Sequence, residues 1–162
     1  MRTLLLLRHA TTEGARPGHP DRARRLTPDG AQEAAAVGDH LREQGVHPDV
    51  VLCSPATRGR QTVAALRLSA PVVVSDRLYN AGGDEIIDLL RTLDDEVERV
   101  LVVGHAPGLP ATVHELADPE SSHAQALASI AWRFPAGTLA TLGVSGPWTG
   151  LRHAALLAAR LP

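Results

Sequence analysis

Two histidines and two arginines follow short apolar runs in this chain. Arg8 and His9 come directly after the first run, Arg58 lies just beyond the second, and His105 follows a later one. A guanidinium group offers paired donors to an oxyanion, and phosphate fits this geometry especially well. A zinc site usually needs a third protein ligand, and the neighbouring arginines would repel a cation. The residue types therefore predict a phosphate pocket and no metal.

His9 is the candidate nucleophile of this pocket. A neutral imidazole can attack phosphorus with one ring nitrogen while the other donates to a backbone carbonyl, which fixes the tautomer. Nearby arginine charge helps to keep the imidazole unprotonated and stabilises the transferring phosphoryl oxygens. His105, if protonated, could donate to the same oxygens. A single histidine is more often an ordinary loop residue, but two histidines beside arginines favour a site.

The elements that must hold these residues alternate between strands and helices. Short apolar runs predict buried strands over residues 3–7, 49–53, 72–74 and 99–104. Helical patterns separate them, so we predict an α/β fold with a doubly wound, mostly parallel sheet and helices on both faces. In such sheets ligands bind beyond the carboxyl ends of the strands. The candidate residues all fall at that edge.

The connecting segments carry recognisable end signals. Thr27 and Pro28 predict the N-cap and first residue of a helix that Gly45 ends in the left-handed conformation. Residues 11–26 lack periodicity and predict a long loop, and loops of this length are often functional. Further elements are helices over 56–68, 84–93 and 109–116, a strand over 138–144, and two segments, 126–132 and 154–161, that fit either a helix or a strand.

Composition is typical of a globular protein. The chain has 162 residues, which fits one domain over 1–162, with 44% apolar and 21% charged residues. All 16 basic residues are arginine and the formal net charge is -2, so no global basic field favours nucleic acid. The single cysteine, Cys53, excludes an internal disulfide and is expected to be a small buried hydrophobe. The N-terminal apolar run is too short for a signal peptide and no stretch spans a bilayer, so we expect a cytoplasmic protein without membrane contact.

Four segments, in order, resemble the motifs of the histidine phosphatase superfamily, also called the phosphoglycerate mutase-like family. They are residues 7–10 (LRHA), 26–30 (LTPDG), 54–62 (SPATRGRQT) and 103–108 (VGHAPG). The resemblance implies the fold of that family and a phosphohistidine intermediate on His9. It also implies that Arg8, Arg58 and His105 complete the phosphate pocket, and that no cofactor is needed. Within the third motif the spacing favours Arg58 over Arg60.

The chain departs from this family at the acid that protonates a leaving alkoxide. Mutase-type members carry a glutamate where this chain has residues 78–81 (LYNA), and acid-phosphatase members follow the second histidine with aspartate, where this chain has Ala106. Two candidate proton donors remain. They are Asp84, for which a helix N-cap role is favoured, and Glu13, on the loop after the nucleophile. The segment 78–81 and the compact length of this chain resemble the SixA-like phosphohistidine phosphatases, short members that lack this acid. A phosphoramidate substrate needs less help from an acid.

The predicted partner is thus a phosphate-bearing substrate, with a phosphohistidine protein favoured, and the oligomeric state is left open. A small-molecule phosphomonoesterase of the same family and a non-catalytic phosphate or phosphoprotein-binding module remain as alternatives; a mutase is less favoured. Arg22, Arg24 and Arg25 could steer an acidic partner to the pocket, although charged loops are usually only solvated. Trp132 and Trp148 are expected to pack in the core or at an edge.

Overall fold

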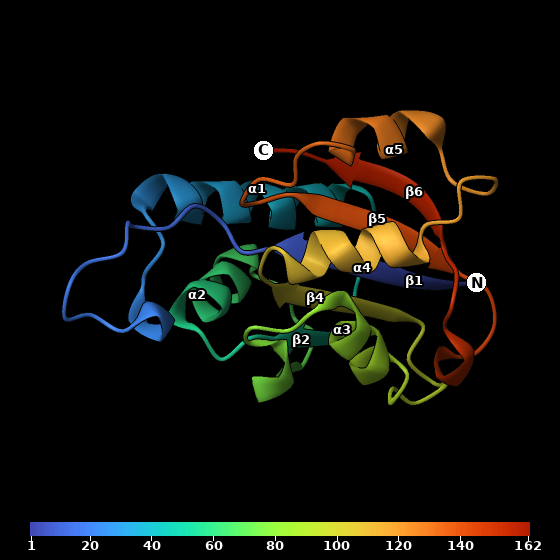
Figure 1. The fold of residues 1–162 in the computed structure, drawn as a ribbon, viewed down its shortest axis with the longest axis horizontal. Helices are drawn as coiled ribbons and strands as arrows, with labels where there is room; N and C mark the ends of the chain where they lie inside the picture. Colours follow the sequence, from blue (N-terminus) through green and yellow to red (C-terminus); the bar gives the residue numbers. More distant parts are fainter.

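A computed structural model describes all 162 residues and shows one six-stranded sheet. The strands are β1 (Arg2–Arg8), β2 (Val50–Cys53), β3 (Val72–Val74), β4 (Arg99–Gly104), β5 (Leu139–Val144) and β6 (Ala155–Arg160). Their order across the sheet is β3-β2-β4-β1-β5-β6 (Figure 1). The first four strands of the chain pair in parallel, whereas β5 pairs antiparallel with β1 and with β6. The predicted α/β fold with a mostly parallel sheet is confirmed.

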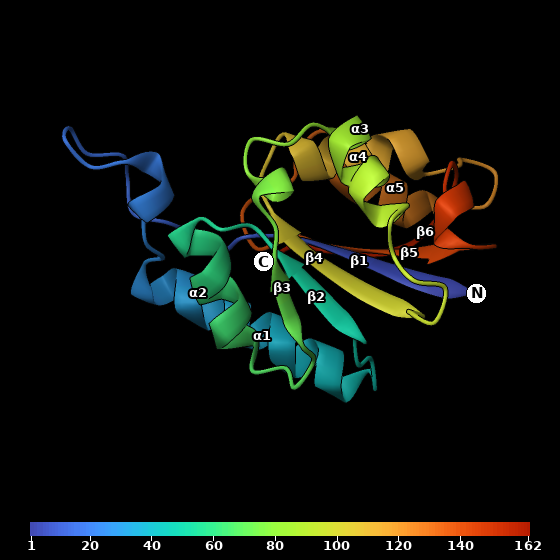
Figure 2. The same cartoon turned by 90° about the horizontal axis from the view of Figure 1, so that it is seen from below.

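Helices cover both faces of this sheet. They are α1 (Pro28–Glu43), α2 (Thr57–Leu66), α3 (Gly83–Leu90), α4 (Gly108–Leu116) and α5 (Ala124–Ile130). Figure 2 shows α1 and α2 on one face and α3, α4 and α5 on the other. Because the central strands are buried on both sides, they appear in the sequence as unbroken apolar runs. None of the helices combines the length and apolar character needed to cross a membrane.

Strand β1 contributes to a hydrophobic core on each face. Successive side chains of a strand point to opposite faces. Leu4 and Leu6 belong to the larger hydrophobic cluster, packed with α3, α4 and α5, and Leu5 and Leu7 belong to the smaller one, packed with α1 and α2. All four leucines are at most 1% exposed. Burial of each such side chain is worth roughly 1.5–3 kcal/mol, so the strand that ends at Arg8 is held firmly.

The carboxyl ends of β1, β4 and β2 lie side by side. The register pairs Arg8 with Gly104. One residue further on, the backbone N–H of His9 donates to the carbonyl oxygen of Gly104 at 2.9 Å. Beyond β2, the backbone N–H of Ser54 donates to the carbonyl oxygen of Val103 at 3.1 Å. The three segments that carry the candidate residues therefore leave the sheet at one edge.

The predicted ends of α1 are confirmed. The Oγ1 of Thr27 accepts a hydrogen bond from the N–H of Gly30 at 2.9 Å, as an N-cap residue does. Gly45, with a φ of +66°, follows the other end of the helix. Position 30 favours glycine, because a β-carbon there would overlap the carbonyl oxygen of Thr11. The start of α1 thus packs directly against the loop over residues 11–26.

Several assignments differ from the sequence predictions. Helix α3 begins at Gly83 after Gly82 as its N-cap, so the N-cap role favoured for Asp84 was wrong. The two ambiguous segments form helix α5 and strand β6. The loop over 11–26 contains a short 3-10 turn, Asp21–Ala23, and a β-bridge between Thr12 and Leu26. This loop projects away from the sheet, as the blue segment of Figure 2 shows.

The two tryptophans have opposite environments. Trp148 is fully buried, and its Nε1 donates to the carbonyl oxygen of Val97 at 2.7 Å. Trp132, just beyond the end of α5, is 97% exposed. The prediction that both pack in the core or at an edge was therefore wrong for Trp132, which contacts solvent over almost its whole surface.

Candidate active site

The structure brings His9 and His105 together at the carboxyl edge of the sheet. Their ring centroids lie 5.2 Å apart. Arg8 is the last residue of β1, and Arg58 lies in the first turn of α2 with a side chain that is 7% exposed. Burial first, and then the charges of these two arginines, lower the pKa of both imidazoles. The four residues predicted for the phosphate pocket thus lie together, whereas Arg60 is exposed.

His9 is held as a neutral imidazole with one free nitrogen. The residue is 6% exposed. Its Nδ1 donates to the carbonyl oxygen of Ala10 at 2.8 Å, since a carbonyl can only accept. Burial, followed by the charges of Arg58, Arg8 and Arg24, lowers the pKa of His9 to about 4. At neutral pH the ring therefore has its lone pair on Nε2, the nitrogen that is not bonded to the backbone.

Three N–H donors around the histidines have no acceptor within the protein. They are the buried Nε atoms of Arg8 and Arg58 and the buried Nδ1 of His105. An unpaired buried donor costs about 1–3 kcal/mol, so several of them in one place suggest a site built for an external acceptor. Arg8 is fixed from behind, because its Nη1 donates to the carbonyl oxygen of Phe134 at 2.8 Å. Such donors can bind the oxygens of a phosphoryl group.

A buried serine fixes the ring of His105. Ser54 is fully buried, and its Oγ lies 2.6 Å from Nε2 of His105. The backbone N–H of Ala56 donates to this hydroxyl at 3.3 Å. The imidazole is the one acceptor that the hydroxyl contacts, and a buried hydroxyl proton without an acceptor is costly, so we assign the hydroxyl as the donor to Nε2. Burial, and then the charges of Arg58 and His9, lower the pKa of His105 to about 4. The neutral ring then carries its proton on Nδ1 and can donate without becoming an imidazolium.

Asp21 is a site residue that sequence reasoning missed. Arg58 donates to its carboxylate from Nη2 at 3.0 Å and to its backbone carbonyl from Nη1 at 2.8 Å. The hydroxyl of Tyr79 donates to the same carboxylate at 2.6 Å. These contacts, the tyrosine hydrogen bond above all, lower the pKa of Asp21, so its carboxylate is ionised at neutral pH. No local pattern marks Asp21, because it lies in a loop without periodicity and its partners are 37 and 58 residues away.

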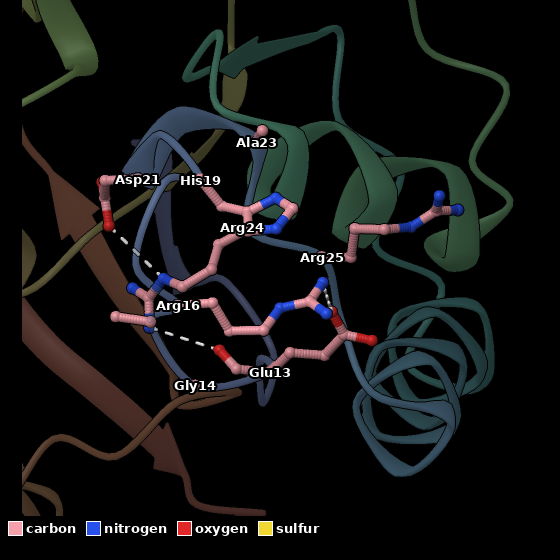
Figure 3. A pocket seen from close by; sticks show the side chains of 9 residues that line it. Glu13, Gly14, Arg16, His19, Asp21, Ala23, Arg24 and Arg25 are labelled. Carbon is pink, nitrogen blue, oxygen red and sulfur yellow. Dashed lines mark hydrogen bonds and ion pairs between the residues drawn. The ribbon is translucent and has the colours of Figure 1, made fainter.

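The loop that carries Asp21 encloses a small cavity. The cavity has a volume of about 250 Å³, and the charged groups that line it include Arg16, Arg24 and Arg25. In Figure 3, Arg24 extends across the cavity toward Asp21, and the Nε of Arg24 lies 3.3 Å from Oδ1 of that carboxylate. Arg24 also acts on the pKa of His9. The charge of this one loop side chain therefore helps to keep the candidate nucleophile neutral.

Neither predicted proton donor contacts the imidazoles. Glu13 is exposed, and its carboxylate pairs with Arg16, 3.8 Å away, on the outer part of the loop (Figure 3). Asp84 is exposed in the first turn of α3. Both roles stay predictions that no contact supports. The carboxylate that contacts a pocket residue is that of Asp21, which accepts a hydrogen bond from Arg58. Because the pKa of Asp21 is lowered, this group is a carboxylate at neutral pH and cannot act as an acid.

Two other kinds of chemistry at this edge of the sheet would depend on a metal ion or on a thiol. No group of three or more His, Cys, Asp or Glu side chains lies close enough together to hold a metal ion. Cys53, directly before Ser54, is fully buried, and its Sγ contacts the carbonyl oxygen of Ser54 at 3.2 Å. Burial raises the pKa of this thiol to about 11. The reactive groups at the sheet edge are thus imidazoles and guanidinium groups.

Comparison with known proteins agrees with this geometry. Residues 4–87 match the family model of the histidine phosphatase superfamily, branch 1. The chain belongs to this superfamily. The matched part contains His9, Arg8 and Arg58, together with Asp21 and its loop. The family resemblance inferred from the sequence motifs is therefore confirmed, and the first three of the four motifs lie within the matched residues.

Histidine phosphatases of known structure match nearly the whole chain. A protein from Nakamurella multipartitia, provisionally named phosphohistidine phosphatase SixA, is 40% identical with a TM-score of 0.86, over 99% of this chain and 96% of that one. A similarly named protein from Agrobacterium tumefaciens is 29% identical with a TM-score of 0.83, over 99% and 98% of the two chains. An uncharacterized protein of Mycobacterium tuberculosis is 37% identical over 159 residues, which are 96% of this chain and 99% of the relative. This chain is a SixA-like hydrolase, a phosphatase of the histidine type.

Proposed function

We propose that this histidine phosphatase hydrolyses phosphohistidine on a protein, through a phosphohistidine intermediate on its own His9. The state of His9 carries the proposal: a buried neutral imidazole with Nδ1 bonded to Ala10 and Nε2 free. An imidazole in this state can attack phosphorus directly. Arg8, Arg58 and His105 are catalytic residues that bind the phosphoryl oxygens.

Two displacements complete the reaction. In the first, Nε2 of His9 attacks phosphorus and the bond from phosphorus to the substrate imidazole breaks. The substrate imidazole, with a proton on its other nitrogen, leaves as a neutral ring. In the second, a water molecule attacks phosphorus, the bond to Nε2 breaks, and the water supplies the oxygen and the protons of inorganic phosphate. His9 returns to its neutral form with the proton still on Nδ1.

The donors of the pocket match the charge of the phosphoryl group during transfer. In the transition state this charge spreads over three equatorial oxygens. The Nε atoms of Arg8 and Arg58 and the Nδ1 of His105 each offer one N–H without another acceptor. Donors that are already in place in a buried site stabilise such charge more strongly than water does. We infer that these three groups hold the phosphoryl oxygens while Nε2 of His9 attacks.

The leaving group decides between phosphohistidine and a phosphate ester. An alkoxide needs a proton from a general acid as it leaves. The carboxylate nearest the pocket, Asp21, cannot supply one at neutral pH, because its hydrogen bonds to Tyr79 and Arg58 lower its pKa. A phosphorylated imidazole that carries a proton on its other nitrogen leaves as a neutral base and needs no such acid. The names of the relatives from Nakamurella and Agrobacterium support the same substrate class.

A panel of phosphohistidine substrates and phosphate esters tests which class of substrate the enzyme prefers. The panel contains a phosphohistidine peptide, a phosphohistidine carrier protein, phosphoserine and glycerol phosphate. We expect kcat/KM for the phosphohistidine substrates to exceed that for the two esters by at least about 100-fold, the usual scale of an acid catalyst that the esters lack here. Faster turnover of the esters would instead assign a small-molecule phosphomonoesterase.

A single substitution tests the intermediate. We expect His9→Ala to abolish both phosphate release and an acid-labile, base-stable phosphoenzyme. His47→Ala is the matched control, because His47 is an exposed histidine ahead of β2, at the opposite end of that strand from the pocket. This variant should keep both phosphate release and the phosphoenzyme. If the wild-type protein formed no phosphoenzyme with any donor of the panel, the proposed intermediate would be wrong.

A further inference from the structure

Tyr79 connects three parts of the candidate site. Its hydroxyl donates to the carboxylate of Asp21 at 2.6 Å. The guanidinium carbon of Arg22 lies 5.0 Å from the centre of its ring, and the ring meets that of His105 edge-on, with the centroids 5.7 Å apart. The preceding residue, Leu78, is 2% exposed and anchors this stretch in the core. Tyr79 is therefore a fixed point that holds the loop over 11–26 at the catalytic edge.

The contact with Asp21 matters because of the way Asp21 holds Arg58. The backbone carbonyl and the carboxylate of Asp21 accept hydrogen bonds from Nη1 and Nη2 of Arg58, at 2.8 Å and 3.0 Å. These bonds occupy the end of the guanidinium group. They leave its Nε, which is buried and has no acceptor in the protein. Because a guanidinium group is planar and rigid, Asp21 sets its orientation, and the Nε edge remains for an anion.

We propose that Tyr79 is a positioning residue for phosphate binding: its hydroxyl fixes Asp21, and Asp21 fixes Arg58 with the Nε edge toward the phosphoryl oxygens. The inference deepens the proposed function and rests on it for the identity of the bound group. Without the tyrosine hydrogen bond, the carboxylate of Asp21 can rotate. The rotated carboxylate then holds Arg58 less firmly, and it competes with phosphate for the N–H groups of this guanidinium. A hydrogen bond to an ionised carboxylate belongs to the stronger class, which suits this role.

Binding of inorganic phosphate, measured by calorimetry, tests this connection without any turnover. Tyr79→Phe removes the hydroxyl but keeps the ring and its contacts with Arg22 and His105. We expect it to weaken phosphate binding about three- to tenfold, the range of an ordinary net hydrogen bond, because the hydroxyl acts on phosphate only through Asp21. In an Asp21→Ala background the same change should cost less than about twofold, because the connection is already broken. Arg60→Ala, at the exposed arginine of the same motif, is the matched control and should leave the affinity unchanged.

Two outcomes would overturn the inference. An equal loss of affinity in both backgrounds would show that Tyr79 acts through packing rather than through Asp21. No loss in the wild-type background would show that the hydroxyl does not act on the pocket at all. Because phosphate binding needs no hydrolysis, a failure on phosphohistidine substrates would leave this result standing, so the two proposals can fail separately.

A spectroscopic readout is also available, because Tyr79 is the only tyrosine of the chain. Its ionisation can be followed by the ultraviolet absorbance of tyrosinate. The hydrogen bond to Asp21 raises the pKa of Tyr79 above its ordinary value. We expect Asp21→Ala to move the titration to lower pH, whereas an unchanged titration would show that the hydrogen bond is not formed in solution and would overturn the inference.

Discussion

The backbone N–H of His9 donates to the carbonyl oxygen of Gly104 at 2.9 Å. This hydrogen bond extends the parallel pairing of β1 and β4 one residue beyond the sheet. His9 and His105 therefore start from the same rigid edge, although they lie far apart in the sequence. The relative position of the two imidazoles is thus set by the most deeply buried part of the molecule.

We expect stability to depend on pH through these two histidines. Their pKa values are about 4 in the folded protein and 6.5 in an unperturbed chain. Between these values the unfolded chain binds more protons than the folded one, so the free energy of unfolding decreases as the pH falls from 6.5 toward 4. The loss should be a few kcal/mol, at most about 3 kcal/mol for each histidine. Denaturant unfolding at several pH values measures it.

The double variant His9→Gln, His105→Gln is the control for this pH dependence. It removes both groups with lowered pKa and keeps every carboxylate of the protein. We expect the free energy of unfolding of the double variant to decrease less steeply below pH 6.5. If the variant kept the full wild-type slope, the pH dependence would have to come from other groups.

Ser54→Ala tests how the ring of His105 is held. The serine hydroxyl donates to Nε2, which favours the neutral ring with its proton on Nδ1. Its removal should raise the pKa of His105, mix the two tautomers and lower kcat/KM about tenfold. The ring-nitrogen chemical shifts of His105 in NMR report the tautomer directly. Ser129→Ala on α5 is the matched control, since that hydroxyl donates only to its own helix, and unchanged shifts in Ser54→Ala would contradict the assignment.

Arg58→Lys keeps the positive charge of the pocket but removes the planar guanidinium group. An ammonium group cannot bond Asp21 at two points and present a third donor in a fixed direction. We expect kcat/KM on phosphohistidine to fall about 100-fold. Arg60→Lys in the same helix should change it less than about twofold. A similarly small effect of Arg58→Lys would show that charge alone suffices at this position.

Gly30→Ala tests the close packing of α1 against the loop after His9. The new β-carbon would overlap the carbonyl oxygen of Thr11, and a backbone atom cannot move aside as easily as the end of a side chain. We expect a loss of about 2–3 kcal/mol in the free energy of unfolding. Gly14→Ala is the matched control, because a β-carbon there would meet nothing within 4 Å. Equal stability of the two variants would show that the loop relaxes freely.

The parts of the fold that hold the pocket could be predicted from local patterns. The leucine run of β1 is buried on both faces, so it stood out as an unbroken apolar segment. Thr27 and Gly45 marked the ends of α1, because a capping hydroxyl and a left-handed glycine depend only on neighbouring residues. From these strand ends the meeting of His9, Arg58 and His105 could be inferred.

Other features depend on contacts between distant residues and could not be predicted. Asp21 and Tyr79 are 58 residues apart, and neither lies in a periodic segment. The alanine-rich segments that form α5 and β6 have a weak hydrophobic period, and pairing with β5 decides that the second is a strand. The exposure of Trp132 likewise follows from where the chain turns after α5, which no local pattern indicates.

The buried Cys53 has a consequence for the enzyme under oxidative stress. With a pKa of about 11, its sulfur is a protonated thiol at neutral pH, and peroxides and alkylating reagents attack the thiolate. The proposed hydrolysis uses no sulfur at any step. Phosphatases with a cysteine nucleophile lose activity when that sulfur is oxidised. This protein should therefore continue to remove phosphoryl groups in hydrogen peroxide, at concentrations that silence such enzymes.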